Sequence, residues 1–274
     1  MKKTLFYITA ASAILSLSSC AFFELDNYEA PSETLRGRVV DMDGNPVLTE
    51  QASEGIRVRF WDLTWEAQGH ETLPVDFNCK PDGTFQNTKM FPGDYRVTVD
   101  GPFVPIVRDA SDGTPIVNGA KEINIKEGEP CEIEFQVQPF LNVEFVGIPM
   151  VSEGVITAKV KVTRAISRED LNNTMAPTGN WNEDNANVTD IKLFIGYSST
   201  MGNRNDDEYW TGTINFNGSE FDALEGQEIE ITSLVEHPIP SGRHVFVRAA
   251  ARINYQTANV QRYNYSEQLE VRIP

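Results

Sequence analysis

The chain has 274 residues, with 23 basic and 40 acidic side chains and a formal net charge of −17. This length suits two domains better than one compact core. So acidic a surface repels phosphate backbones and anionic lipid, which argues against nucleic-acid binding.

Residues 1–19 have the layout of a secretory signal peptide. Lys2 and Lys3 form a basic start, residues 5–17 carry no charge, and small residues lead into Cys20. The apolar stretch is too short to span a membrane as a helix. A cysteine at this position is typical of lipoproteins, in which the thiol carries the lipid. The alternative is an ordinary signal peptide beside a chance cysteine.

Residues 20–33 are interpreted as a lipidated tether. Glu24, Asp26 and Glu29 make the stretch after Cys20 acidic, and Pro31 closes it. An acidic stretch at this place resembles the surface-export signal of Bacteroidetes lipoproteins. The resemblance implies a protein held to the outer membrane through the lipid on Cys20 and facing the cell surface.

Residues 34–138 alternate apolar and polar side chains with the period of β-strands. Ile56, Val58 and Phe60 form one phase of such a segment, and Arg57, Arg59 and Trp61 form the other. Turn-forming residues interrupt the pattern at 41–46, 82–83 and 92–93. This half is predicted to be a β-sandwich without a helix of ten or more residues.

Residues 139–274 start a second series of strands just after Pro139. Seven are expected, at residues 141–145, 155–162, 191–197, 209–216, 228–231, 245–253 and 268–273. The polar stretch 164–187 is predicted to be a long loop with one helical turn at 167–171. The prediction is therefore an all-β protein with two consecutive β-sandwich domains after a lipoprotein signal peptide.

Two cysteines remain after Cys20. Cys79 and Cys131 both lie on alternating segments and could form one disulfide outside the cytoplasm. The alternative, which we favour slightly, is two buried free thiols that pack as small apolar groups.

No residue set has the spacing of a catalytic or metal site. The three histidines, His70, His237 and His244, lie in separate segments, and none has a second ligand at zinc spacing. The acidic stretches 41–45 and 203–208 offer oxygen ligands for calcium, but turn chemistry and a solvated loop explain them better. We predict no enzyme, cofactor or metal. A hydrolase with a carboxylate pair on loops is the least favoured alternative.

Tryptophans are the candidate ligand-binding residues. Trp61 lies on the phase opposite to Val58 and Phe60, Trp65 follows in a predicted loop, and Trp181 has acidic and amide neighbours. Sugars stack their C–H faces on exposed aromatic rings, whereas tryptophan in a sandwich is more often buried. Trp210, on a predicted strand, is assigned to the core.

Several residue blocks resemble known families. The blocks that resemble a carboxypeptidase-regulatory-like or transthyretin-like sandwich are Leu35-Arg36-Gly37-Arg38-Val39-Val40-Asp41, Gly44-Asn45-Pro46-Val47, Gly55-Ile56-Arg57-Val58, Asp82-Gly83-Thr84-Phe85 and Phe91-Pro92-Gly93-Asp94-Tyr95-Arg96-Val97. Residues 243–252 resemble the penultimate strand of a fibronectin type III (immunoglobulin-like) domain. Neither resemblance implies an activity.

The whole chain resembles a family of uncharacterised two-domain Bacteroidetes lipoproteins, through Asp26-Asn27-Tyr28-Glu29-Ala30-Pro31 leading into Leu35-x-Gly37. Members are commonly encoded beside glycan-uptake receptor pairs of the starch-utilisation type. The resemblance implies a non-enzymatic surface lipoprotein that binds a polysaccharide or docks to the receptor pair. The alternative is a structural, assembly or adhesin-type protein without a small ligand.

Overall fold

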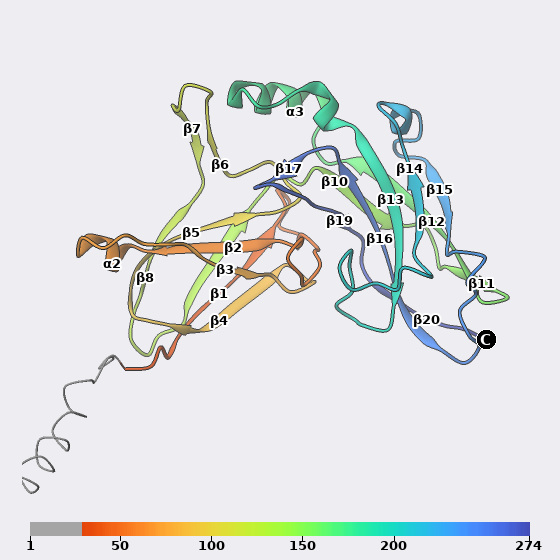
Figure 1. The fold of residues 1–274 in the computed structure, drawn as a ribbon, viewed down its shortest axis with the longest axis horizontal. Helices are drawn as coiled ribbons and strands as arrows, with labels where there is room; N and C mark the ends of the chain where they lie inside the picture. The colour runs from red at the N-terminus through yellow and green to blue at the C-terminus, as the bar shows by residue number, and fades with distance from the viewer. Residues whose placement is uncertain (1–28) are drawn as a thin grey trace, which may run out of the picture.

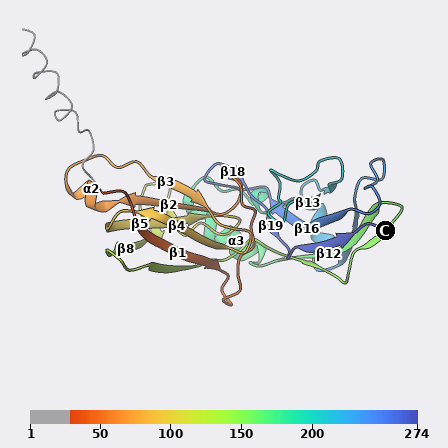
Figure 2. The ribbon, with the colours of Figure 1, turned by 90° about the horizontal axis from the view of Figure 1, so that it is seen from below.

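The computed structural model describes residues 29–274, so the predictions for residues 1–19 and for Cys20 lie outside the described residues. Two large hydrophobic clusters divide the described chain. Residues 35–137 form one cluster, and residues 140–273 together with Val104 form the other. We call these parts the N-terminal half and the C-terminal half. They lie end to end, with the start of β1 at one end of the molecule and the C-terminus at the other (Figures 1 and 2).

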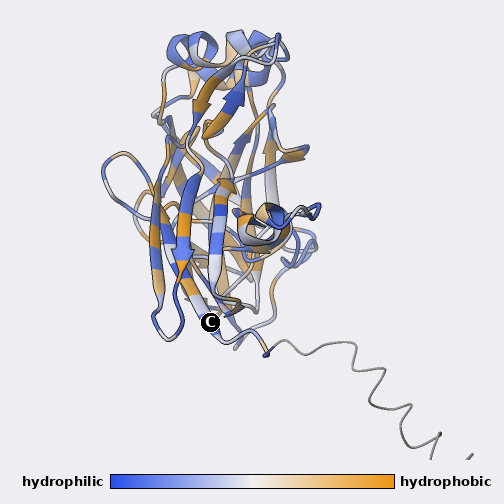
Figure 3. Ribbon diagram, turned by 90° about the vertical axis from the view of Figure 1, so that its left-hand side faces the viewer, coloured by the Kyte–Doolittle hydropathy of each residue, from blue (hydrophilic) through white to orange (hydrophobic). Residues whose placement is uncertain are grey.

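The N-terminal half has two main sheets. One has the order β4 (Thr84–Met90), β1 (Glu33–Val40), β9 (Cys131–Gln136), and the other has the order β3 (Val75–Asn78), β2 (Arg57–Asp62), β5 (Gly93–Asp100), β8 (Lys121–Ile125). A separate hairpin pairs β6 (Val107–Asp109) with β7 (Pro115–Asn118). Apolar and polar residues alternate along the strands (Figure 3), because one face of each sheet packs on the core.

Strand β1 is antiparallel to β4 and parallel to β9. The parallel pair joins the first and last strands of the half, so it closes the half on itself. Arg38 forms an ion pair with Glu134 across it, at 2.6 Å between Nε and Oε2, and Arg36 pairs with Glu132 in the same way. Both pairs are exposed, so each contributes at most about 1 kcal/mol.

A short helix, α2 (Leu63–Ala67), follows β2, and Trp65 lies within it. The prediction that Trp65 lies in a loop was therefore wrong. The helix begins because the Asp62 side chain accepts a hydrogen bond from the Trp65 backbone N–H at 2.9 Å. A five-residue helix buries no apolar face of its own, and no helical periodicity marks it in the sequence.

The C-terminal half is also built from two main sheets. One contains β10 (Leu141–Phe145), β12 (Val155–Arg164), β11 (Met150–Ser152) and β15 (Glu228–Thr232), and the other contains β14 (Gly212–Asn215), β13 (Val188–Gly196), β16 (His244–Ile253), β19 (Asn264–Tyr265) and β20 (Leu269–Arg272). A small hairpin pairs β17 (Gln256–Thr257) with β18 (Val260–Gln261). The predicted all-β fold is confirmed.

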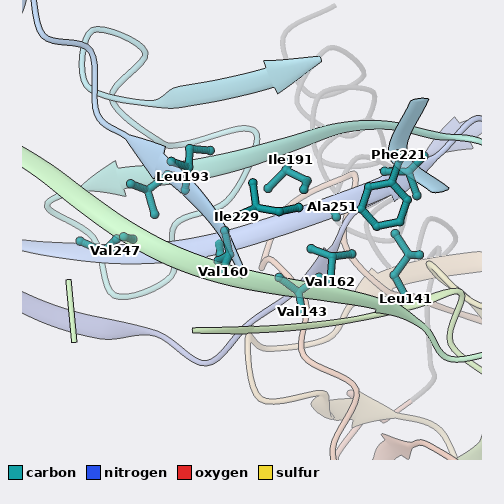
Figure 4. Packing of buried hydrophobic residues seen from close by; sticks show 14 of the residues in the cluster. Leu141, Val143, Val160, Val162, Ile191, Leu193, Phe221, Ile229, Val247 and Ala251 are labelled. Atoms are coloured by element: carbon teal, nitrogen blue, oxygen red, sulfur yellow. The ribbon is translucent and has the colours of Figure 1, made fainter. Parts of the chain in front are cut away.

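The core of the C-terminal half lies between these two sheets. Side chains of β10, β12 and β15 meet those of β13 and β16 (Figure 4). Val160, Ile191 and Val247 are fully buried there. Burying such a side chain stabilises a fold by about 1.5–3 kcal/mol each, so this cluster provides much of the stability of the half.

The polar stretch after β12 is more helical than expected. It contains α3 (Arg168–Met175) and the short 3-10 helices η2 (Ala176–Thr178) and η3 (Glu183–Ala186), and a fourth, η4 (Glu220–Ala223), precedes β15. Ser167 caps α3, because its Oγ accepts from the Asp170 N–H at 3.0 Å. Leu171 and Met175 bury the inner face of α3. No helix within residues 29–274 is long and apolar enough to cross a membrane.

Cys79 and Cys131 are both free, so the disulfide alternative was wrong. Cys79 is buried in the N-terminal core, and burial raises the pKa of its thiol. Cys131 is half-buried at the start of β9. Both free thiols contact the apolar cluster, as the favoured interpretation expects, but only Cys79 is fully buried.

Candidate functional site

A groove lies at one end of the N-terminal half, where β4 approaches the ends of β2 and β5. We call it the Trp65 groove. It measures about 470 Å³, and the residues that line it are Phe60, Asp62, Trp65, Glu71, Thr72, Leu73, Val75, Asn87, Lys89, Met90, Phe91 and Tyr95. This volume is within the usual range for small-molecule sites.

Local contacts hold Trp65 in place. Besides the Asp62 cap, the Thr64 hydroxyl accepts from the Asp94 N–H at 2.7 Å, which fastens α2 to β5. His70 stacks on the indole, with 3.9 Å between ring centroids and 17° between planes. Trp65 is nevertheless 40% exposed. One face of the indole is therefore supported by His70, and the ring is presented to the groove in a fixed orientation.

The rest of the groove combines apolar and polar groups. Phe91, Leu73 and Val75 are exposed, which is unusual for large apolar side chains gathered in one place. Glu71 and Asn87 add a carboxylate and an amide. A fixed aromatic ring beside hydrogen-bonding groups can hold a small amphipathic ligand such as a sugar ring.

Trp61 lies in a different hollow, of about 490 Å³, on the outer face of β2 and β5. Its ring is half-buried, and the Arg59 guanidinium lies 5.9 Å from the ring centroid. Arg59 forms a two-pronged pair with Asp76, with both N–O distances 2.7 Å, and its hydrogen bonds lower the pKa of the Asp76 carboxyl. The ring and its arginine thus contact each other, which leaves less free aromatic surface than at Trp65.

Trp181 packs against the core of the C-terminal half. It is half-buried, its centroid lies 5.0 Å from that of Tyr255, and its Nε1–H donates to Asn172 Oδ1 at 3.0 Å. The structure therefore does not bring Trp61, Trp65 and Trp181 together in one site. Trp210 is buried, as predicted for a core residue.

Several oxygens of the two acidic stretches accept hydrogen bonds from nearby backbone N–H groups. Asp41 Oδ1 accepts from the N–H groups of Asp43 and Asn45, and Gly44 has a φ of +88° in this turn. In the second stretch, Asn205 Oδ1 accepts from the Gly202 N–H at 2.7 Å. Within residues 29–274, no three His, Cys, Asp or Glu side chains gather where they could hold a metal ion.

A polar cluster joins the two halves, and sequence reasoning did not predict it. The loop 48–55 between β1 and β2 packs on the outer face of the β13–β16–β19 sheet. Arg248 of β16 is 2% exposed and donates from Nη1 to Thr49 O at 2.7 Å. Its guanidinium also lies 4.5 Å from the centroid of the Tyr265 ring. Arg262 donates in the same way to Gly55 O.

Glu50 lies inside this interface with no exposed surface. Its Oε2 accepts from the Arg204 N–H at 3.2 Å, and its Oε1 has no hydrogen-bond partner among the described residues. Burial raises the pKa of Glu50 to about 7, and the nearby Glu54 adds to this, while Arg204 and Arg248 oppose it. A Cβ at Gly202 would come within 2.3 Å of Glu50 Cβ, so only glycine fits there.

A solved structure from Bacteroides uniformis, described as a DUF3823 family protein, is 50% identical to this chain. The match covers 89% of this chain and 100% of that one, with a TM-score of 0.83. The chain belongs to the DUF3823 family. The model of the DUF3823 N-terminal domain, described as a protein of unknown function, matches residues 33–127. The predicted resemblance to an uncharacterised Bacteroidetes family is thus confirmed.

Two more distant solved structures share the fold of this chain. One, from Parabacteroides merdae, is a DUF3823 family protein with 14% identity and a TM-score of 0.58, and covers 89% of this chain and 100% of that one. The other, from Bacteroides uniformis, is provisionally named a carbohydrate binding protein, with 14% identity, a TM-score of 0.60 and the same coverage. No curated protein matches the sequence.

Proposed function

We propose that this DUF3823 protein is a non-enzymatic carbohydrate-binding protein, and that the Trp65 groove holds one sugar ring of a glycan. The observation that carries the proposal is the exposed indole of Trp65, which His70 supports from one side beside the hydrogen-bonding groups of Glu71 and Asn87. The name of the distant Bacteroides uniformis relative supports the same function.

The charge of the chain favours a neutral glycan. A formal net charge of −17 repels sulfated or uronate-rich polysaccharides before they reach the groove. Neutral sugars are not repelled, and stacking on the indole of Trp65 adds to their affinity. We therefore expect the ligand to be a neutral polysaccharide or a fragment of one.

The Trp65→Ala variant should bind a neutral glycan about thirty-fold more weakly, because it loses a central aromatic contact worth about 2 kcal/mol. Isothermal calorimetry, preceded by affinity electrophoresis against a panel of neutral polysaccharides, measures the change. The fold should survive, because Trp65 is 40% exposed and its helix buries no residue.

Trp61→Ala is the matched control for this experiment. It removes the other candidate tryptophan of the same half, whose ring contacts Arg59, and should change affinity less than two-fold. Strong loss in Trp61→Ala with none in Trp65→Ala would move the site to the outer face of β2 and β5. A panel on which the wild type binds nothing would refute the carbohydrate function.

The proposal also includes the cellular location of the protein. A lipid on Cys20 anchors it to the outer membrane, facing the cell surface, where it is an accessory of a polysaccharide-uptake system. The basic and apolar start of the chain and the acidic residues after Cys20 support this. Expressed in a Bacteroides host, the Cys20→Ala variant should no longer incorporate radiolabelled palmitate and should leave the membrane fraction. A variant that still incorporated palmitate would exclude Cys20 as the lipid site.

The apolar rim of the groove supports one second function, docking to a neighbouring receptor pair. Leu73, Val75 and Phe91 expose apolar surface that a protein partner could cover. Pull-down from solubilised outer membranes separates the two functions. Recovery of the receptors without glycan, lost in Trp65→Ala, would favour docking over sugar binding.

A further inference from the structure

A second hollow in the C-terminal half is lined by residues from the end of β13 and from the segment that joins β13 to β14. This segment lies far along the molecule from α2 (Figure 1). It measures about 630 Å³. Tyr197 and Tyr209 line it, together with the amides of Asn203 and Asn205 and the carboxylates of Asp207 and Glu208. None of these residues belongs to the Trp65 groove, and the sequence analysis considered the stretch 203–208 only as possible calcium ligands.

Both tyrosine rings are exposed and yet held by packing. Tyr197 is 54% exposed and meets the buried Trp210 edge-on, with 5.3 Å between centroids. The Arg243 guanidinium lies 6.0 Å from the Tyr197 centroid, so a sugar on that ring also meets this cation. Tyr209 is 60% exposed and meets His237 in the same geometry at 5.2 Å. Such support fixes the rings before a ligand arrives, which lowers the entropy cost of binding.

The polar wall of the hollow is also fixed. Asn205 accepts from the Gly202 N–H and donates from Nδ2 to Thr200 O at 3.2 Å. Asp207 Oδ1 accepts from the Tyr209 N–H at 3.1 Å. These bonds orient the side chains, and each carboxylate or amide oxygen retains capacity to accept a further hydrogen bond.

The N-terminal half holds one wall of this hollow in place. Asn203 Nδ2 donates to Glu54 Oε2 at 2.7 Å, and the Asn203 N–H donates to the Tyr265 hydroxyl at 3.2 Å. The next residue, Arg204, donates its N–H to Glu50. The hollow is therefore built by both halves, although only residues of the C-terminal half line it.

From these observations we propose that the Tyr197–Tyr209 hollow is a second saccharide site, which takes a neutral sugar unit between or upon the two rings. The amide and carboxylate groups accept hydrogen bonds from the sugar hydroxyls, and Glu54 positions Asn203 for this. The site rests on the proposed carbohydrate function but not on the Trp65 groove, because the two share no residue.

The test uses the detergent-solubilised full chain and neutral oligosaccharides of glucose, mannose, xylose and galactose, titrated by calorimetry. The wild type should bind two equivalents. The double variant Tyr197→Ala with Tyr209→Ala should lose one of them, with at least a ten-fold weaker Kd at that site, while Trp65→Ala should lose the other. The phenylalanine double variant keeps the ring faces and should retain both, which separates stacking from a loss of fold.

Glu54→Ala tests the positioning role, because it removes the acceptor of the Asn203 Nδ2–H bond. It should weaken only the tyrosine-dependent equivalent, several-fold, without changing the Trp65-dependent one. Unchanged stoichiometry and affinity in the alanine double variant would overturn the proposal. Tyrosine fluorescence that responded to calcium and to no sugar would also overturn it, in favour of a cation site. If Trp65→Ala abolished all sugar binding and the tyrosine double variant changed none of it, the proposed function would stand and this second site would be refuted.

Discussion

The Glu50→Gln variant is expected to be more stable than the wild type at pH 8 and about equally stable at pH 4.5. The pKa of Glu50 is about 7 in the folded protein, against 4.5 ordinarily, because burial disfavours its charge. At pH 4.5 the carboxyl is protonated in the folded state and half protonated in the unfolded state, so its burial costs little, and below this pH the cost disappears. As the pH rises to 7 the unfolded chain ionises first, and the wild type loses stability.

The full difference corresponds to about 3 kcal/mol above pH 7, from 1.36 kcal/mol for each pKa unit. Glutamine keeps an oxygen for the Arg204 N–H and carries no charge to bury. Urea unfolding at pH 4.5, 6 and 8 measures the effect. Glu129→Gln, which changes an exposed carboxylate, should differ from the wild type in free energy of unfolding by the same amount at all three pH values. If the free energies of unfolding of Glu50→Gln and the wild type differed by the same amount at every pH, Glu50 would ionise normally.

Arg248→Met should destabilise the protein by about 3–5 kcal/mol, because removing one partner of a buried polar cluster leaves the others unsatisfied. Thr49 O would lose its donor across the interface, and Met201 O and Ser266 O would lose bonds in the C-terminal half. Glu50 would also lose a nearby positive charge, so its pKa should rise further. Urea unfolding at pH 7, followed by tryptophan fluorescence, measures the loss.

Arg272→Ala is the control for this variant. Arg272 is exposed on β20 and should change stability by less than about 0.5 kcal/mol. If Arg248→Met had the same free energy of unfolding as Arg272→Ala, the Arg248 guanidinium would not stabilise the contact between the two halves. Adding Glu50→Gln to Arg248→Met should recover part of the loss at pH 8, because the buried negative charge is then removed as well.

Most strands could be predicted from the sequence because they follow period-two alternation around buried positions. The segments at 141–145 and 155–162 correspond to β10 and β12, whose side chains face one core. Elements without that period were missed. Helix α2 depends on one Asp62 cap, and the short strands β17 to β19 contain two residues each, too few to show a pattern.

The candidate sites were harder to predict, for a physical reason. Trp65 was singled out as an aromatic residue away from strand alternation, and it is exposed in the structure. Glu50 lies in a polar segment that reads as a surface turn, and only the C-terminal half buries it. Tyr197 and Tyr209 are twelve residues apart in a loop, so their meeting around one hollow depends on tertiary packing.

The parallel pairing of β1 with β9 determines how the molecule would respond to tension. The chain enters the N-terminal half at the start of β1 and leaves it for the C-terminal half at the end of β9. A pull between these points drags the two neighbouring strands lengthwise past each other. All six paired positions from Leu35–Cys131 to Val40–Gln136 then resist together, instead of opening one after another like a zipper. A ligand held by the C-terminal half would thus pull on the N-terminal half in shear, the direction in which a strand pair is strongest.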